Sequence, residues 1–289
     1  MLCLQIDPCP EYDYDASNLG DPICAPEYAF DIFRYYRYRE VRFSFNYFNK
    51  DVRAALNDWL VGVQEVLLLT HETFYTAIKI VDHFLDKTKE VVEQRDSKLL
   101  GAAAMFIAIK FEERCLSPMA ALLKLCDFSH EELLAMERNM LRTIGFDIGY
   151  PLAYRFLRRY SRVLQLDLPT LTLARYYLET CALYYEFVPT ADSLMAAACL
   201  LLTLRVKQIC DWNPVLEKYS GYVVEDVEPL MWCINHAMLM RRHVYPHLKS
   251  SFHKYSSDVF FEVARFPFLK DKFNLQDPVG PPPDCSFKH

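Results

Sequence analysis

Two side chains of opposite charge are the strongest candidates for chemistry in this chain of 289 residues. Lys110 ends a run of small and apolar residues, and Glu137 falls within an apolar stripe when the segment after Ser129 is projected as a helix. The stripe consists of Leu133, Met136, Met140, Leu141 and Ile144. A carboxylate in such a stripe is paired, neutralised or presented to a partner, because burial of a lone charge is costly. Lys110 is one available partner. The alternative, which the pattern leaves open, is that both side chains reach water past a narrow stripe.

Motifs for catalysis are absent from the sequence. There is no phosphate-binding glycine loop, no His-Glu-x-x-His and no Gly-x-Ser-x-Gly. The ten cysteines include no Cys-x-x-Cys pair and no Cys/His set with zinc spacing. We therefore expect reduced thiols, no metal and no cofactor. A helical enzyme whose acid, base or nucleophile meet only in space stays an alternative.

Charge and hydropathy exclude several kinds of partner. The net charge of −6 gives no broad attraction to nucleic acid. Three basic clusters are expected to be solvated: Arg34 with Arg37 and Arg39, Arg158-Arg159, and Arg241-Arg242-His243. The longest apolar runs are shorter than the roughly 18 residues that span a bilayer, and the first residues do not resemble a signal peptide. We expect a soluble protein of the nucleus, the cytoplasm or both, without a membrane partner.

The elements that must position Lys110 and Glu137 are helices. Seven glycines are too few for a hairpin-rich fold. Helix starts are predicted at Thr70, at Ser117-Pro118, at the capping box Ser129-His-Glu-Glu132 and at Asn213-Pro214.

A weak internal repeat indicates two similar helical domains. Leu100-Gly-Ala-Ala-Ala-Met105 resembles Leu194-Met-Ala-Ala-Ala-Cys199, and an aromatic-rich amphipathic helix precedes each. The boundary is expected near Gly149-Tyr-Pro151. The predicted division is a tail at 1–27, domains at 28–149 and 150–265, and a second tail at 266–289.

The chain resembles the mitotic B-type cyclins over residues 28–265. The first half matches in Tyr28–Tyr36, Arg53–Val61, Leu69–Tyr75, Gly101–Met105 and Lys110–Glu113. In the second half, Phe156–Tyr160, Thr170–Arg175 and Phe260–Ala264 look most like the third B subtype. The resemblance implies an all-α fold of two tandem five-helix cyclin boxes, preceded by an N-terminal helix.

The resemblance also implies a function without catalytic residues. Cyclins bind a cyclin-dependent kinase and hold its C helix in the active position, which a kinase requires before it can align phosphates. Lys110 and Glu137 match the family's two polar anchors on the kinase, whereas Glu112 and Glu113 are expected to form a solvated helix end. The remaining kinase-binding positions implied are Phe111, Leu141, Phe146, Ile148, Tyr28, Ile32 and Tyr35.

A second surface of the family docks Arg-x-Leu motifs of substrates and inhibitors. Its positions here are Val52, Leu56, Trp59 and Lys98. Val52 stands where the family usually has Met, Gly62 where an acidic or amide residue is common, and Lys98 where Gln is common. Less apolar volume and an added positive charge predict a weak or altered docking patch.

Two further departures concern the segments around the first domain. Val41–Lys50 looks shorter than its family counterpart. Residues 1–27 contain no recognisable destruction signal for proteolysis. We therefore expect either that the chain is a fragment or isoform, or that its turnover differs. A divergent cyclin-box adaptor for transcription machinery or other non-kinase partners is the alternative function.

Overall fold

The computed structural model describes residues 7–21, 25–40, 49–88, 96–114 and 119–280. Their regular structure is helical, with no strand within these ranges. None of the described helices is both long and apolar enough to cross a membrane. The predicted helix start at Ser117-Pro118 and most of Val41–Lys50 lie outside the described residues.

The first bundle is built around one helix of small residues. Among the described residues it comprises α3 (Lys50–Val66), α4 (His71–Lys87), α5 (Ser97–Glu112), α6 (Met119–Leu123) and α7 (His130–Thr143). Helix α5 contacts the other four and is buried from Leu100 to Ile109. Small side chains make this possible: a Cβ atom on Gly101 would lie 2.5 Å from Cδ1 of Leu56. The predicted caps at Thr70 and Ser129 are confirmed.

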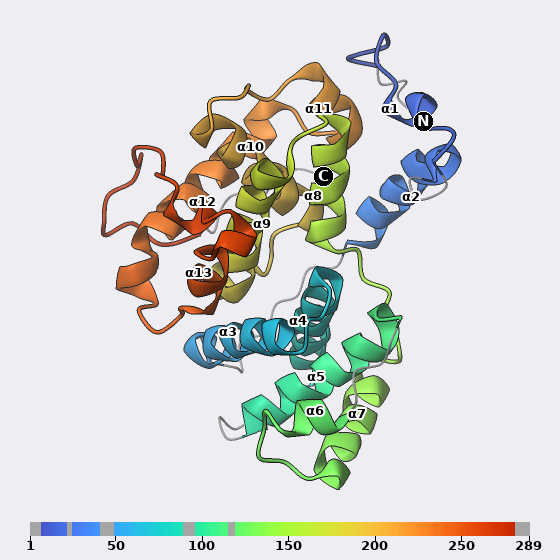
Figure 1. Ribbon diagram of the computed structural model, residues 1–289, viewed down its shortest axis with the longest axis vertical. Coiled ribbons are helices and arrows are strands. Elements are labelled where there is room, and N and C mark those ends of the chain that lie inside the picture. Colours follow the sequence, from blue (N-terminus) through green and yellow to red (C-terminus); the bar gives the residue numbers. More distant parts are fainter. Residues whose placement is uncertain (1–6, 22–24, 41–48, 89–95, 115–118, 281–289) are drawn as a thin grey trace.

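The second bundle repeats this plan in the upper half of Figure 1. Its helices among the described residues are α8 (Ala153–Val163), α9 (Leu168–Leu183), α10 (Asp192–Val206), α11 (Pro214–Ser220) and α12 (Val224–Val244). Helix α10 is buried from Asp192 to Leu204 between α8, α9 and α12. The internal repeat therefore marks the central helix of each bundle.

The segment expected as an N-terminal tail packs on the second bundle. It contains α1 (Tyr14–Ser17) and leads to α2 (Pro26–Arg39). Arg159 of α8 forms a bidentate ion pair with Asp15. The hydroxyl of Tyr12 donates to the carbonyl of Val163 at 2.8 Å. The expectation of a tail is thus wrong for residues 7–21, because their contacts come from residues more than 100 positions away.

The segment after residue 265 is also docked. Asn235 on α12 exchanges two hydrogen bonds of 3.1 Å with the backbone of Leu269. The ring of His236 bonds Asp271 at 2.7 Å. The expectation of a C-terminal tail is therefore wrong for residues 266–277, which follow the surface of α12.

The basic clusters divide between solvated and structural residues. Arg34 pairs with Asp31 on an exposed surface, as expected. Arg37 instead donates to the carbonyl of Ser220 at 2.8 Å, and Arg159 and Arg241 are 6% and 8% exposed. The expectation that these arginines are solvated is wrong, because each finds an acceptor on another element.

A buried network joins the two bundles at α13 (Ser250–Tyr255). The ammonium of Lys254 donates to both carboxylate oxygens of Glu179 on α9, at 2.8 and 2.7 Å. It also donates to Gln64 on α3 at 2.7 Å, and Tyr255 donates to Glu179 at 2.9 Å. All of the ammonium's donors are thereby satisfied out of contact with water.

Replacement of Lys254 with Met is expected to lower the free energy of unfolding by about 3–5 kcal/mol, since Glu179 would remain buried without its counter-charge. Urea unfolding followed by circular dichroism measures this change. Lys270→Met, at an exposed lysine, is the matched control and is expected to have little effect. Equal stability of both variants would contradict the assignment.

Candidate functional site

Lys110 and Glu137 form an ion pair at the surface of the first bundle. Lys110 lies in the last turn of α5, and Glu137 comes from α7 between buried Leu133 and Met140. Glu137 is 7% exposed, whereas the side chain of Lys110 is 39% exposed. Of the possibilities that the sequence left open for this carboxylate, the structure shows pairing, and the partner is Lys110.

The ammonium of Lys110 is held in place on a second side. It lies 4.2 Å from the centroid of the Phe106 ring, within the range of a cation–π contact. Partial burial lowers the pKa of Lys110 from its usual value. An oriented ammonium beside a carboxylate offers a donor and an acceptor at one place, which suits a partner's backbone.

Two exposed phenylalanines lie near these residues in the sequence. Phe111 follows Lys110 and is 48% exposed, and Phe146 follows α7 and is 66% exposed. Leu141 and Ile148 are half-buried against the core. Phe146 has φ of 61°, a left-handed conformation that costs about 1–3 kcal/mol in a residue other than glycine. Exposed aromatic rings on such a held backbone are typical of a binding surface.

Helix α2 presents further aromatic residues. Tyr28 and Tyr35 are 64% and 57% exposed, and Ile32 is half-buried. The predictions did not include Phe30 and Tyr38, which are also exposed. The sequence feature that could have indicated these two residues is the high density of aromatic residues along this helix.

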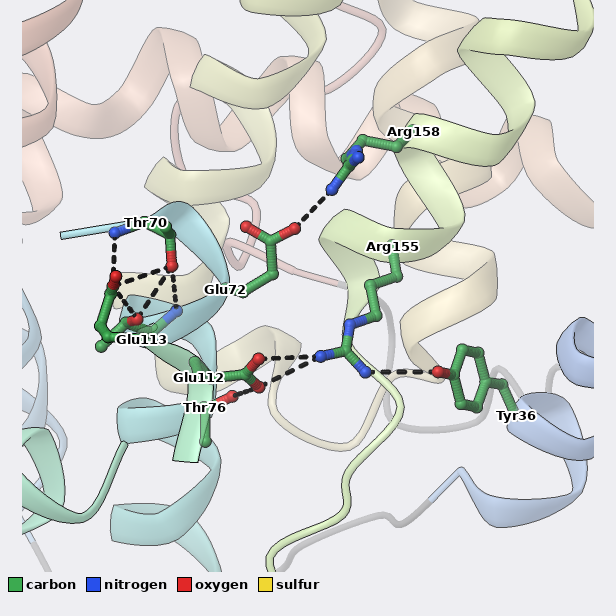
Figure 2. Close-up of polar contacts among 9 residues, drawn as sticks. Tyr36, Thr70, Glu72, Thr76, Glu112, Glu113, Arg155 and Arg158 are labelled. Carbon is green, nitrogen blue, oxygen red and sulfur yellow. Dashed lines mark hydrogen bonds and ion pairs between the residues drawn. The ribbon is translucent and has the colours of Figure 1, made fainter. Parts of the chain in front are cut away.

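Glu112 and Glu113 link elements and are not a solvated end of α5. Figure 2 shows the two carboxylates turned toward different partners. Glu113 accepts hydrogen bonds from the backbone amide of Thr70 at 2.8 Å and from the hydroxyl of Thr73 at 2.5 Å. It thereby ties the end of α5 to the start of α4. The expectation of a solvated end is wrong because this end of α5 is covered by α4 and α8.

Glu112 connects the two bundles and α2. Arg155 on α8 donates to both of its oxygens, at 3.2 and 2.9 Å, and Thr76 on α4 donates at 2.7 Å (Figure 2). The second end of the Arg155 guanidinium donates to the hydroxyl of Tyr36 on α2 at 3.3 Å. This polar cluster, two residues from Lys110, sets where α2 and the second bundle lie relative to the Lys110–Glu137 pair.

The positions of the predicted docking patch lie on α3 and α5. Val52 and Trp59 are half-buried, but Leu56 is only 3% exposed. Leu56 and Trp59 pack over Gly101, at 2.5 and 3.4 Å from the site of its missing Cβ. Lys98 is exposed one helical turn before Gly101, and so places its charge beside these apolar side chains.

The arrangement is suited to recognition. Among the described residues, no group of His, Cys, Asp and Glu side chains has the geometry of a metal site. The ion pair and the exposed phenylalanines instead lie on the first bundle, and further aromatic residues lie on α2. The polar cluster at Glu112 connects the first bundle to α2.

Comparison with known families identifies both bundles. The family described as "Cyclin, N-terminal domain" matches residues 31–149, and "Cyclin, C-terminal domain" matches residues 151–269. The chain belongs to the cyclin family. Its two bundles are tandem cyclin boxes, preceded by α2, and family members are non-catalytic regulators of protein kinases.

Individual cyclins resemble the chain over most of its length. The G2/mitotic-specific cyclin-B3 of Caenorhabditis elegans is 44% identical over 94% of this chain and 74% of the relative. The cyclin-B3 of Gallus gallus is 44% identical over 88% and 64%, and that of Homo sapiens 41% identical over 94% and 20%. The chain thus spans from three quarters to one fifth of the length of these relatives. A viral cyclin from herpesvirus saimiri shares the fold, with a TM-score of 0.60 and 20% identity over 78% of this chain and 99% of that chain.

The attachment of α2 to the C-terminal cyclin box contains a titratable carboxylate. Glu40, directly after α2, accepts hydrogen bonds from the backbone amide and the hydroxyl of Ser193 at 2.5 and 3.0 Å. It thereby caps α10, since Ala191 has no capping side chain. Burial, followed by the nearby charge of Asp192, raises the pKa of Glu40 to about 7.

We expect this carboxylate to make stability fall as pH rises from about 4.5 to about 7. In this window the unfolded chain has released the proton of Glu40 while the folded protein retains it. Glu40→Gln is expected to remove roughly 2–3 kcal/mol of this decline. Urea unfolding at several pH values measures it, with Glu27→Gln on the exposed face of α2 as the control. An unchanged pH profile in Glu40→Gln would contradict the assignment.

Proposed function

We propose that this cyclin is the activating regulatory subunit of a cyclin-dependent kinase in mitotic or meiotic control. The observation that carries the proposal is the Lys110–Glu137 pair on the N-terminal cyclin box, which also exposes Phe111 and Phe146. The kinase is proposed to be of the mitotic type, bound as a heterodimer in the nucleus, the cytoplasm or both. The cyclin-B3 names of the relatives support this class and do not favour an adaptor for transcription machinery.

The ion pair is suited to hold a backbone segment of the kinase. An ammonium has three donors, so Lys110 can bond a carbonyl while it keeps Glu137. The carboxylate of Glu137 has acceptor capacity for a backbone amide. Because each charge already neutralises the other, neither is left unpaired when the interface excludes water.

Apolar contacts would supply the larger share of the binding energy. Phe111 and Phe146 offer rings that can be buried against the kinase C helix, and Tyr28 and Tyr35 offer a second contact on α2. Held from both places, the C helix keeps its glutamate in reach of the kinase's active-site lysine. The polar cluster at Glu112 supports this action because it keeps the two contact areas in one arrangement.

The double variant Lys110→Ala with Glu137→Ala is expected to weaken binding to a monomeric mitotic kinase by at least about 30-fold. This is the effect of an interface hot spot of about 2 kcal/mol. Binding is measured by titration calorimetry and activation by phosphorylation of histone H1.

The matched control is Arg265→Ala with Glu262→Ala, which removes an exposed ion pair of the C-terminal cyclin box. The control is expected to bind and activate as the unmodified chain does, and circular dichroism should be the same for both variants. Full activation by the Lys110/Glu137 variant, or failure of the unmodified chain to bind any cyclin-dependent kinase, would refute the proposal.

The docking patch is proposed to bind Arg-x-Leu peptides weakly. Lys98 repels the arginine of such a peptide, and the buried Leu56 offers little apolar surface. Lys98→Gln is expected to tighten binding about fivefold, for about 1 kcal/mol of exposed charge repulsion. Fluorescence anisotropy with a labelled Arg-x-Leu peptide measures this, with Lys124→Gln as the control. Tight binding by the unmodified chain would contradict the prediction.

A further inference from the structure

An open groove of about 380 Å³ lies between the end of α12 and the helix α13 in the C-terminal cyclin box. Its floor is apolar: Tyr245 and Leu248 are buried and fixed, and Phe252 is half-buried. The ring of Tyr245 stacks on Tyr184 at 4.8 Å between centroids. This stacking holds Tyr245 in the floor of the groove.

The rim of this groove is positively charged. Arg242, Lys249 and His253 line it and are exposed. The stretch 241–254 contains four Lys or Arg residues and three His, but no Asp or Glu, in a chain of net charge −6. The groove is thus a local reversal of the overall charge.

Two acids beside the groove, Asp58 and Glu186, are engaged elsewhere, whereas Glu65 lies near His253 and Asp51 near Tyr245. Asp58 on α3 accepts from the backbone amide and hydroxyl of Ser250, at 2.9 and 2.8 Å. Glu186 accepts from Tyr245 at 3.3 Å. Within the described part of the chain, no carboxylate forms an ion pair with Arg242 or Lys249.

Two guanidinium groups are gathered at one aromatic ring. Arg241 lies 4.3 Å and Arg242 5.8 Å from the centroid of Phe252. Arg241 is anchored by a 2.7 Å hydrogen bond to the hydroxyl of Tyr176, whereas Arg242 has no such anchor. Like charges that share one aromatic ring are stabilised when a carboxylate joins them, since charge-assisted bonds to guanidinium are strong.

The helices that line the groove lie apart from the proposed kinase contacts. Figure 1 shows α12 and α13 on the side of the C-terminal cyclin box opposite α2, and α5 and α7 below. A partner in the groove would therefore leave the Lys110–Glu137 surface open. The groove can act while a kinase is bound.

We propose that this basic groove is a docking site for an acidic peptide segment of a protein partner. One large apolar side chain of the peptide lies over Leu248 and Phe252, and flanking Asp or Glu residues bond Arg242 and Lys249. The apolar floor favours a peptide over a nucleic acid, because a phosphate backbone would leave that floor uncovered and would be repelled by the chain's net charge. Recruitment through this groove would add to, and not depend on, the weakened Arg-x-Leu patch.

The test is fluorescence anisotropy of the full chain with a labelled peptide, Glu-Asp-Glu-Phe-Asp-Glu. The double variant Arg242→Glu with Lys249→Glu is expected to weaken binding by about tenfold or more, as charge reversal does at complementary interfaces. The control Lys124→Glu with Lys270→Glu makes the same change in net charge at exposed lysines outside the groove and is expected to bind normally. Peptides with Gln and Asn for the acids, or Ala for Phe, are each expected to bind more weakly.

Three results of the binding experiment would overturn the proposal: equal loss in the groove and control variants, equal binding of the neutral or Phe-to-Ala peptide, and tighter binding of a single-stranded oligonucleotide. Kinase activation separates this site from the proposed function. The groove variant is expected to activate the kinase normally with a substrate that lacks acidic motifs. Loss of that activity together with peptide binding would show that the groove is not a separate site, and this too would overturn the proposal.

Discussion

The rest of the structure depends on one helix, α5, which is enclosed by its neighbours and nevertheless ends in charged residues. The small residues from Gly101 to Ala104 let α3, α4 and α7 approach closely, so the helix is enclosed for most of its length. At the end of α5, three charged residues each have a specific partner. Lys110 pairs with Glu137, Glu112 with Arg155, and Glu113 with the threonines at the start of α4.

This end of α5 couples packing to recognition. The Lys110–Glu137 pair faces outward, while the carboxylate two residues on holds α8 and, through Arg155, α2. A second set of contacts, from Arg53 on α3 to Asp82 and to the carbonyls of Ala182 and Leu183, crosses between the boxes in the interior. The proposed kinase surface is therefore rigid because buried and partly buried charges are satisfied on both sides of the junction between the boxes.

The terminal segments extend this arrangement. Residues 7–21 lie against α8 and α11 through Asp15, Tyr12 and Lys218, and residues 266–277 lie along α12. Residues 7–21 hold the start of α2. Its other end is held where Glu40 accepts a hydrogen bond from Ser193 on α10. With α2 fixed at both ends, the exposed tyrosines of that helix have a defined place relative to the N-terminal cyclin box. The opposite side of the C-terminal cyclin box carries the positively charged stretch 241–254, although the net charge of the chain is −6.

The amino-acid sequence alone determined the helical class and the two similar halves, and it offered Lys110 as one partner for Glu137 without deciding the pairing. These follow from patterns within a few helical turns, such as the apolar stripe after Ser129 and the two Ala-rich segments, and from the resemblance that they support. The roles of Glu112, Arg159 and residues 7–21 did not follow, because the sequence pattern predicts a solvated helix end, a solvated arginine and an N-terminal tail. Only the tertiary structure decided them, because their partners lie on other helices, up to 209 residues away in the sequence. A single charge carries no local sign of the partner that folding will bring to it.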